Sequence, residues 1–113
     1  MGRREVGLTR AAEDAVAVLG QQIRLARIRR GLTAEGLAGT AGLSRKTLSA
    51  IENGSGASSI GAVFNVATIV GVPLFGVDDP SELIALRRRG EERLALLPAR
   101  VDERREDDDG LDF

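Results

Sequence analysis

The chain has 113 residues, a net charge of −1, no Cys and no His. Without Cys the chain can form neither a disulfide nor a thiolate metal site, and without His it lacks the commonest general base. We therefore expect no enzyme activity, no metal and no cofactor. The net charge hides an asymmetry, because residues 1–54 carry nine basic and five acidic side chains whereas residues 55–113 carry seven and twelve. The first half therefore suits a polyanionic partner, and the second half does not.

The N-terminal part of the chain predicts a helix with a preceding arm. Residues 1–16 are interpreted as an arm and helix extension, in which Thr9 caps a helix that begins near Arg10. Apolar positions at helical spacing continue this pattern to Arg30. Gly20 interrupts the pattern, so one long helix and two shorter pieces are both open.

Two short helices are expected next, joined by a tight turn. Thr33 is a natural cap for a helix that runs to about Ala41. Gly42 allows the left-handed backbone that a tight turn requires. Ser44 caps a further helix, which ends near Asn53.

The remainder of the chain predicts two more helices and a tail. Ser58 or Ser59 caps a fourth helix, after which Leu74 and Phe75 are expected to cover the end of a bundle. The domain is assigned to residues 17–76, and a fifth helix that opens at Asp79-Pro80 is assigned to residues 77–101 for dimerisation or partner docking. Residues 102–113 hold seven acids and two Arg, which predicts a disordered tail when the chain is alone.

The segment from Thr33 to Glu52 satisfies the requirements of a helix-turn-helix. Such a motif needs a buried anchor and a small residue in its first helix, a turn that contains Gly, and an apolar inner face on its second helix. These positions are met in order by Leu37, Ala38, Gly42, Leu48 and Ile51. The pattern predicts a DNA-binding motif, and the alternative is a pair of core helices in an unrelated bundle.

The run from Gly31 to Thr33 and from Leu43 to Gly54 resembles the Cro/phage-repressor family, also called the XRE family. This resemblance covers about Leu19 to Leu74 and implies an all-α, five-helix lambda-repressor-like domain. It implies sequence-specific binding to double-stranded operator DNA as a homodimer. The helix from Arg45 to Asn53 would then be the recognition helix in the major groove.

The resemblance also implies a role for individual residues. Base edges would be read by Arg45, Lys46 and Ser49, and phosphates would be bound by Thr33, Ser44, Thr47 and Asn53. The family commonly pairs a Glu near the end of the recognition helix with an Arg on the first helix, which here are Glu52 and Arg27. The sequence departs from the family at Ala34, where a phosphate-binding Gln is common, and at Gly36 and Gly39, where helix-favouring polar residues are usual. The alternative for Arg45 and Lys46 is that both side chains are simply exposed to solvent and have no role in DNA binding.

One branch of this family is more specifically similar, the antitoxins that resemble HipB. The similarity lies in residues 19–24, 44–54 and 72–75 and in a C-terminal extension. It implies a type II toxin–antitoxin operon, autorepression, and binding to a HipA-like Ser/Thr kinase toxin. Leu111 and Phe113 among acids have the form of a segment that folds onto a basic groove.

Two alternatives stay open: a stand-alone phage-type or one-component repressor with no toxin partner, and a protein-interaction module that binds no DNA. The chain has no apolar run near the roughly 20 residues that cross a bilayer, and its start lacks a signal-peptide pattern. We therefore expect a cytoplasmic, nucleoid-associated protein without membrane contact.

Overall fold

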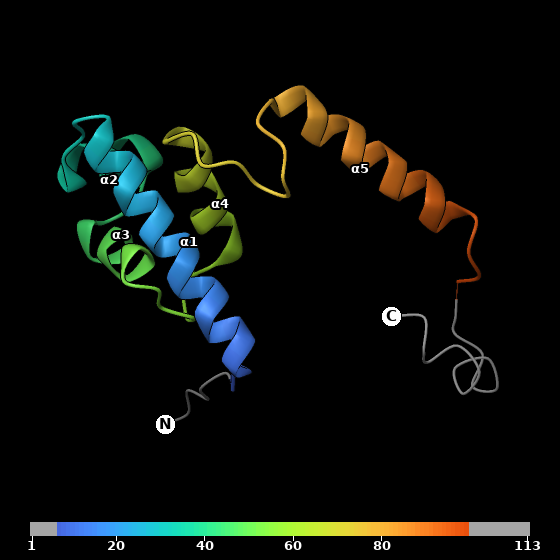
Figure 1. The fold of residues 1–113 in the computed structure, drawn as a ribbon, viewed down its shortest axis with the longest axis horizontal. Coiled ribbons are helices and arrows are strands. Elements are labelled where there is room, and N and C mark those ends of the chain that lie inside the picture. The colour runs from blue at the N-terminus through green and yellow to red at the C-terminus, as the bar shows by residue number, and fades with distance from the viewer. Residues whose placement is uncertain (1–6, 100–113) are drawn as a thin grey trace. The chain divides into compact units, whose positions relative to one another are not determined.

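The computed structural model describes residues 7–99, and within this range the chain forms five α-helices and no strand beyond one isolated bridge (Figure 1). The expected all-α fold with five helices is confirmed. The chain divides into two units, of which the first ends at Asp78 and the second begins at Asp79. The helices are α1 (Arg10–Arg29), α2 (Ala34–Ala41), α3 (Arg45–Glu52), α4 (Ile60–Ile69) and α5 (Pro80–Ala95).

All five helices begin at a polar cap. In each case the side-chain oxygen of the cap accepts a hydrogen bond from a backbone N–H of the first turn, which otherwise has no partner inside the helix. Asp79 also forms a capping box with Glu82 and precedes a Pro in the first turn. Local sequence is therefore sufficient to start each helix, and the five caps are Thr9, Thr33, Ser44, Ser59 and Asp79.

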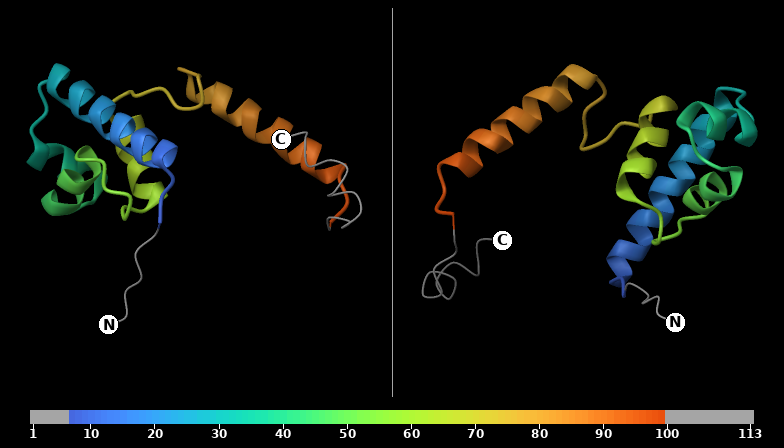
Figure 2. Two further views of the ribbon diagram at one scale, coloured as in Figure 1. Left: turned by 60° about the horizontal axis from the view of Figure 1, so that its bottom comes forward. Right: turned by 180° about the vertical axis from the view of Figure 1, so that it is seen from behind.

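Helix α1 is one continuous helix of 20 residues. It passes through Gly20 without a break and extends across the boundary placed at residue 16 in the sequence. Gly20 and Ile23 are its buried residues. In Figure 2, α1 runs the length of the first unit and the other three helices of that unit lie beside it.

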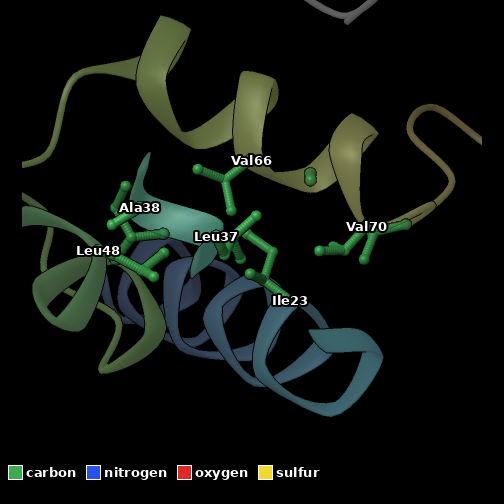
Figure 3. Packing of buried hydrophobic residues seen from close by; sticks show 9 residues of the cluster. Ile23, Leu37, Ala38, Leu48, Val66 and Val70 are labelled. Atoms are coloured by element: carbon green, nitrogen blue, oxygen red, sulfur yellow. The ribbon is translucent and has the colours of Figure 1, made fainter. Parts of the chain in front are cut away.

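The first unit has a small aliphatic core to which all four of its helices contribute. Figure 3 shows side chains from these helices pointing into one common interior. The outer members of the core include Leu43 and Leu74, which pack against it while partly exposed. The buried residues are Ile23, Leu37, Ala38, Leu48, Ile51, Val66, Ala67, Val70 and Val72.

The expectation for the end of the bundle holds for only one of its two residues. Leu74 packs against the core, but Phe75 is 72% exposed. Phe75 adopts a left-handed backbone with φ 56°, and its ring forms an edge-to-face contact with the ring of Phe64, at a centroid distance of 5.8 Å. Phe75 is therefore not a core residue, and the isolated bridge between Leu74 and Val77 closes the first unit.

Helix α5 belongs to the second unit. It continues through Gly90 to Ala95 and is capped at Leu96, just before Pro98. None of its residues is buried. In the part of the chain from residue 7 to residue 99, no helix combines the length and the apolar character that a membrane crossing requires.

Candidate nucleic-acid interface

Helices α2 and α3 are joined by a turn of three residues, Gly42, Leu43 and Ser44. Gly42 has φ 72° and ψ 30°, the left-handed conformation that a residue with a Cβ avoids. The backbone N–H of Leu43 donates to the carbonyl of Ala38 at 2.8 Å, which closes the end of α2. This short turn with Gly at its first position is the connection of a helix-turn-helix.

Helix α3 has two faces of opposite character. Leu48 and Ile51 are buried, with 0% and 2% of their surface exposed. Arg45, Lys46 and Ser49 are exposed. Because a helix turns by about 100° per residue, these three positions share one arc on the side away from the buried pair. The first turns of α3 therefore present two cations and a hydroxyl outward while its inner face is held in the core.

The four side chains expected at phosphates are placed by the helix ends. Thr33 Oγ1 accepts from a backbone N–H of α2 at 2.9 Å, and Ser44 Oγ accepts from the N–H of Thr47 at 3.1 Å. Ser44 Oγ also donates to Thr47 Oγ1 at 3.0 Å. Thr33 and Thr47 act only as acceptors in these bonds, so each keeps an O–H to donate. Asn53 caps the end of α3 and donates to Ser49 Oγ at 3.3 Å.

The charge at the start of α3 differs from that of other helices. The first turns of α1, α2 and α5 carry Glu13, Glu35 and Glu82, which complement the positive end of the helix dipole. The first turn of α3 has no acidic residue and instead carries Arg45 and Lys46. These cations add to the positive helix end, so an approaching anion is attracted there.

A close contact between backbones holds α3 against α1. A Cβ on Gly20 would lie 2.5 Å from the carbonyl oxygen of Ile51 and 2.9 Å from that of Glu52. A Cβ on Gly54, just after α3, would lie 2.9 Å from the Cα of Ala17. We call this contact the α1–α3 seam, formed by Ala17 and Gly20 on one side and the end of α3 on the other.

The seam was not predicted from the sequence, where Gly20 was considered only as an interruption of the first helix. A signal for it exists, since Ala17 and Gly20 are small residues one helical turn apart on the same face. Whether these small residues serve a close helix contact depends on which segment packs against them, and only the fold shows that this segment is the end of α3. The seam fixes how far α3 stands from the rest of the unit.

The ion pair between Arg27 and Glu52 is present and joins α1 to the end of α3. Arg27 Nε donates to Glu52 Oε2 at 2.7 Å and Arg27 Nη2 donates to Oε1 at 3.2 Å, a two-pronged contact. Arg27 Nη1 also donates to the carbonyl of Leu32 at 2.9 Å, in the loop before α2. The hydrogen bond to the Glu52 carboxylate raises the pKa of Arg27. Both side chains are largely buried, with 13% and 8% exposed.

Two predicted site residues are not placed. Leu111 and Phe113 lie outside residues 7–99, as does the rest of the acidic tail. Among the described residues, no group of three or more acidic or other metal-ligating side chains is gathered where it would hold a metal ion.

Comparison with known proteins agrees with this geometry. The model of a family described as helix-turn-helix domain matches residues 18–78, which is more than half of the chain. The match includes α2, the Gly42 turn and α3. No curated protein and no solved structure matches the chain. The chain therefore belongs to the helix-turn-helix domain family, a family of DNA-binding domains.

Proposed function

We propose that the protein is a transcriptional regulator that binds a specific double-stranded operator, with α3 in the major groove. The observation that carries this proposal is the division of α3 into a fixed inner face and an exposed face that holds Arg45, Lys46 and Ser49. Arg and Lys donate well to O6 and N7 of guanine, and each good bidentate pair contributes about 1–3 kcal/mol of discrimination between bases. These three residues are proposed to read base edges.

Phosphates are the proposed partners of the residues around the helix ends. Thr33 and Thr47 each keep a hydroxyl proton beyond their capping bonds, and Asn53 is exposed at the end of α3. Ser44 contributes mainly by capping α3, because its hydroxyl is already donated to Thr47. Contacts of this kind set orientation on the duplex without reading sequence.

The narrower proposal is a repressor of the Cro/phage-repressor type that acts as a homodimer. Two copies would place their α3 helices in successive major grooves, about 34–36 Å apart, and would block access to a promoter. Because the complex forms by neutralising phosphates, its affinity is expected to fall steeply with salt.

The test begins with selection of duplexes from a random pool by the full chain. The selected duplex and a scrambled one are then compared by fluorescence anisotropy at several salt concentrations. Specific binding that the scrambled duplex lacks supports the proposal. Equal binding of both duplexes at every salt concentration would contradict it.

Variants then separate base readers from phosphate contacts. Arg45→Ala and Lys46→Ala are each expected to flatten the preference among operator variants, while a phosphate contact would lower affinity for all sequences alike and reduce the salt slope by about 1. The matched control is Arg88→Ala on α5, which removes the same charge from an exposed site outside the motif. Preservation of the preference in both α3 variants would remove these residues from the reading face.

The antitoxin role is the more specific proposal for the same protein. It is supported by the similarity to HipB-like antitoxins and by the acidic C-terminal sequence that contains Leu111 and Phe113. Purification of the N-terminally tagged chain from its own cells is expected to capture a HipA-like kinase, and a chain cut after Val101 is expected to lose it. Capture of the protein and DNA alone, unchanged by truncation, would favour the stand-alone repressor.

A further inference from the structure

Helix α5 has an apolar face that the second unit leaves uncovered. Leu94 is 69% exposed and Leu86 is 36% exposed, and no residue from Pro80 to Ala95 is buried. Helices of about this length are marginal in water unless an amphipathic face packs against something. The stability of α5 therefore calls for a partner surface.

The apolar positions of α5 are arranged symmetrically about Gly90. Leu86 and Leu94 lie four residues before and after it, and Leu83 and Leu97 lie seven residues before and after it. Because a helix turns by about 100° per residue, the four positions from 83 to 94 share one narrow stripe, and Leu97 follows in the capping turn. We call these five residues, Leu83, Leu86, Gly90, Leu94 and Leu97, the α5 stripe. A pattern that reads the same in both directions is self-complementary under a two-fold axis, which is the requirement of a closed two-fold interface between identical chains.

The described residues of the second unit give no reason for Gly90 at the centre of the stripe. A Cβ placed on it would meet no atom within 4 Å, so no neighbour demands a Gly there. Gly is also unfavourable in the interior of a helix. A missing side chain at the middle of the stripe would let a second helix approach closely.

Charges beside the stripe match an antiparallel copy on one side and oppose it on the other. Arg87 and Glu91 form an exposed pair at 3.1 Å, and a two-fold axis at Gly90 would set Arg87 of each copy near Glu91 of the other. On the other side, Arg93 would lie near Arg89 of the second copy. The pairs of Arg87 with Glu91 favour the antiparallel dimer, whereas the pairs of Arg89 with Arg93 repel. Reversing one charge in the repelling pairs is therefore expected to stabilise the dimer.

From these observations we propose that α5 packs antiparallel against α5 of a second copy of this chain, with the two-fold axis at Gly90 and the α5 stripes in contact. This inference rests on the proposed homodimer and names the surface that forms it. It assigns Leu86 to contact Leu94 of the second copy, and the DNA-reading face is not involved.

Disulfide trapping tests the arrangement directly, because the chain contains no Cys. Leu86→Cys and Leu94→Cys are prepared on full chains that carry tags of different size, and they are oxidised alone and as a mixture. The antiparallel pair predicts a disulfide in the mixture that joins the two tags, and little in either variant alone. Leu96→Cys, in the adjacent off-stripe position, is the control and is expected not to cross-link. Disulfides within each single variant, or none in the mixture, would overturn the proposal.

Sedimentation equilibrium without DNA gives a second measurement. Leu94→Asp is expected to raise the dimer dissociation constant by at least about 100-fold, since each dimer loses two apolar contacts. Leu96→Asp, which changes a more exposed leucine in the same turn, is expected to leave it unchanged. Arg93→Glu is expected to tighten the dimer about 3-fold by pairing with Arg89 of the other copy.

Two further measurements distinguish the α5 interface from a dimer interface on α1, and failure of the α5 proposal from failure of the DNA-binding proposal. Leu25 on α1 is 52% exposed, and loss of the dimer in Leu25→Asp with retention in Leu94→Asp would overturn the assignment to α5. Binding of a single half-site duplex does not require a dimer, so it reports on α3 alone. Half-site binding that survives in Leu94→Asp while the dimer is retained would refute the α5 interface and leave the DNA-binding proposal standing.

Discussion

The α1–α3 seam and helix α2 both contain glycine, but for opposite reasons. At the seam, Gly20 lies where a Cβ would collide with backbone carbonyls of α3. In α2, Gly39 faces open space, and a Cβ there would touch nothing within 4 Å. The same residue type is thus required by a close approach in one helix and is only a cost in the other.

This difference divides the motif into a fixed part and a weak part. Helix α3 is held by the seam and by the Arg27–Glu52 ion pair, whose atoms resist displacement because they are largely buried. Helix α2 carries two glycines, Gly36 and Gly39, and the intrinsic helix propensity of Gly is roughly 0.5–1 kcal/mol less favourable than that of Ala. A stiff helix α3 beside a less stable helix α2 is the expected result.

The largest effect is expected from Gly20→Ala. In an ordinary helix this change stabilises, but here the added methyl must displace the carbonyl of Ile51, so we expect the free energy of unfolding to fall by about 2–3 kcal/mol. Urea denaturation followed by circular dichroism measures it. A variant as stable as the parent chain would mean that α1 and α3 are not in close contact.

The ion pair comes next. Glu52→Gln keeps an oxygen that accepts from Arg27 but removes the charge, and we expect a loss of about 1–2 kcal/mol, because a charge-assisted hydrogen bond is roughly twice as strong as a neutral one. A double-mutant cycle with Arg27→Gln measures the coupling. Strictly additive losses in the cycle would show that the two side chains do not interact in solution.

Local sequence was sufficient to predict the helices and the motif. Thr33, Ser44 and Gly42 act within a few residues of their own position, and their caps and turn are found as expected. The α1–α3 seam could not be predicted from local sequence, because it brings Gly20 against backbone carbonyls more than 30 residues further along the chain. Phe75, which was expected to cover the end of the bundle with Leu74, is 72% exposed, and its left-handed backbone is likewise not evident from its residue type.

Gly39→Ala should sharpen the comparison by changing stability in the opposite direction. With open space around the new methyl and a helical backbone, the variant is expected to gain roughly 0.5–1 kcal/mol of unfolding free energy. Amide hydrogen exchange in α2 should slow accordingly, while exchange in α3 should change less. Destabilisation instead of a gain would indicate that a neighbouring segment covers this side of α2.

The smallest effect is expected from Gly36→Ala, where the two reasons for glycine nearly cancel. A Cβ on Gly36 would lie 3.0 Å from Thr33 Oγ1, the same oxygen that accepts the N–H of Gly36 at 2.9 Å. The gain in helix propensity is offset by the shift it forces on the cap, whose full loss would cost about 1 kcal/mol. We therefore expect a net change within about 0.5 kcal/mol of zero. The same Gly36→Ala substitution is then made in a Thr33→Ala background, in which the cap is absent. There Gly36→Ala is expected to gain as much unfolding free energy as Gly39→Ala does in the parent chain. A gain equally small in that background would mean that the Thr33 hydroxyl is not what limits it.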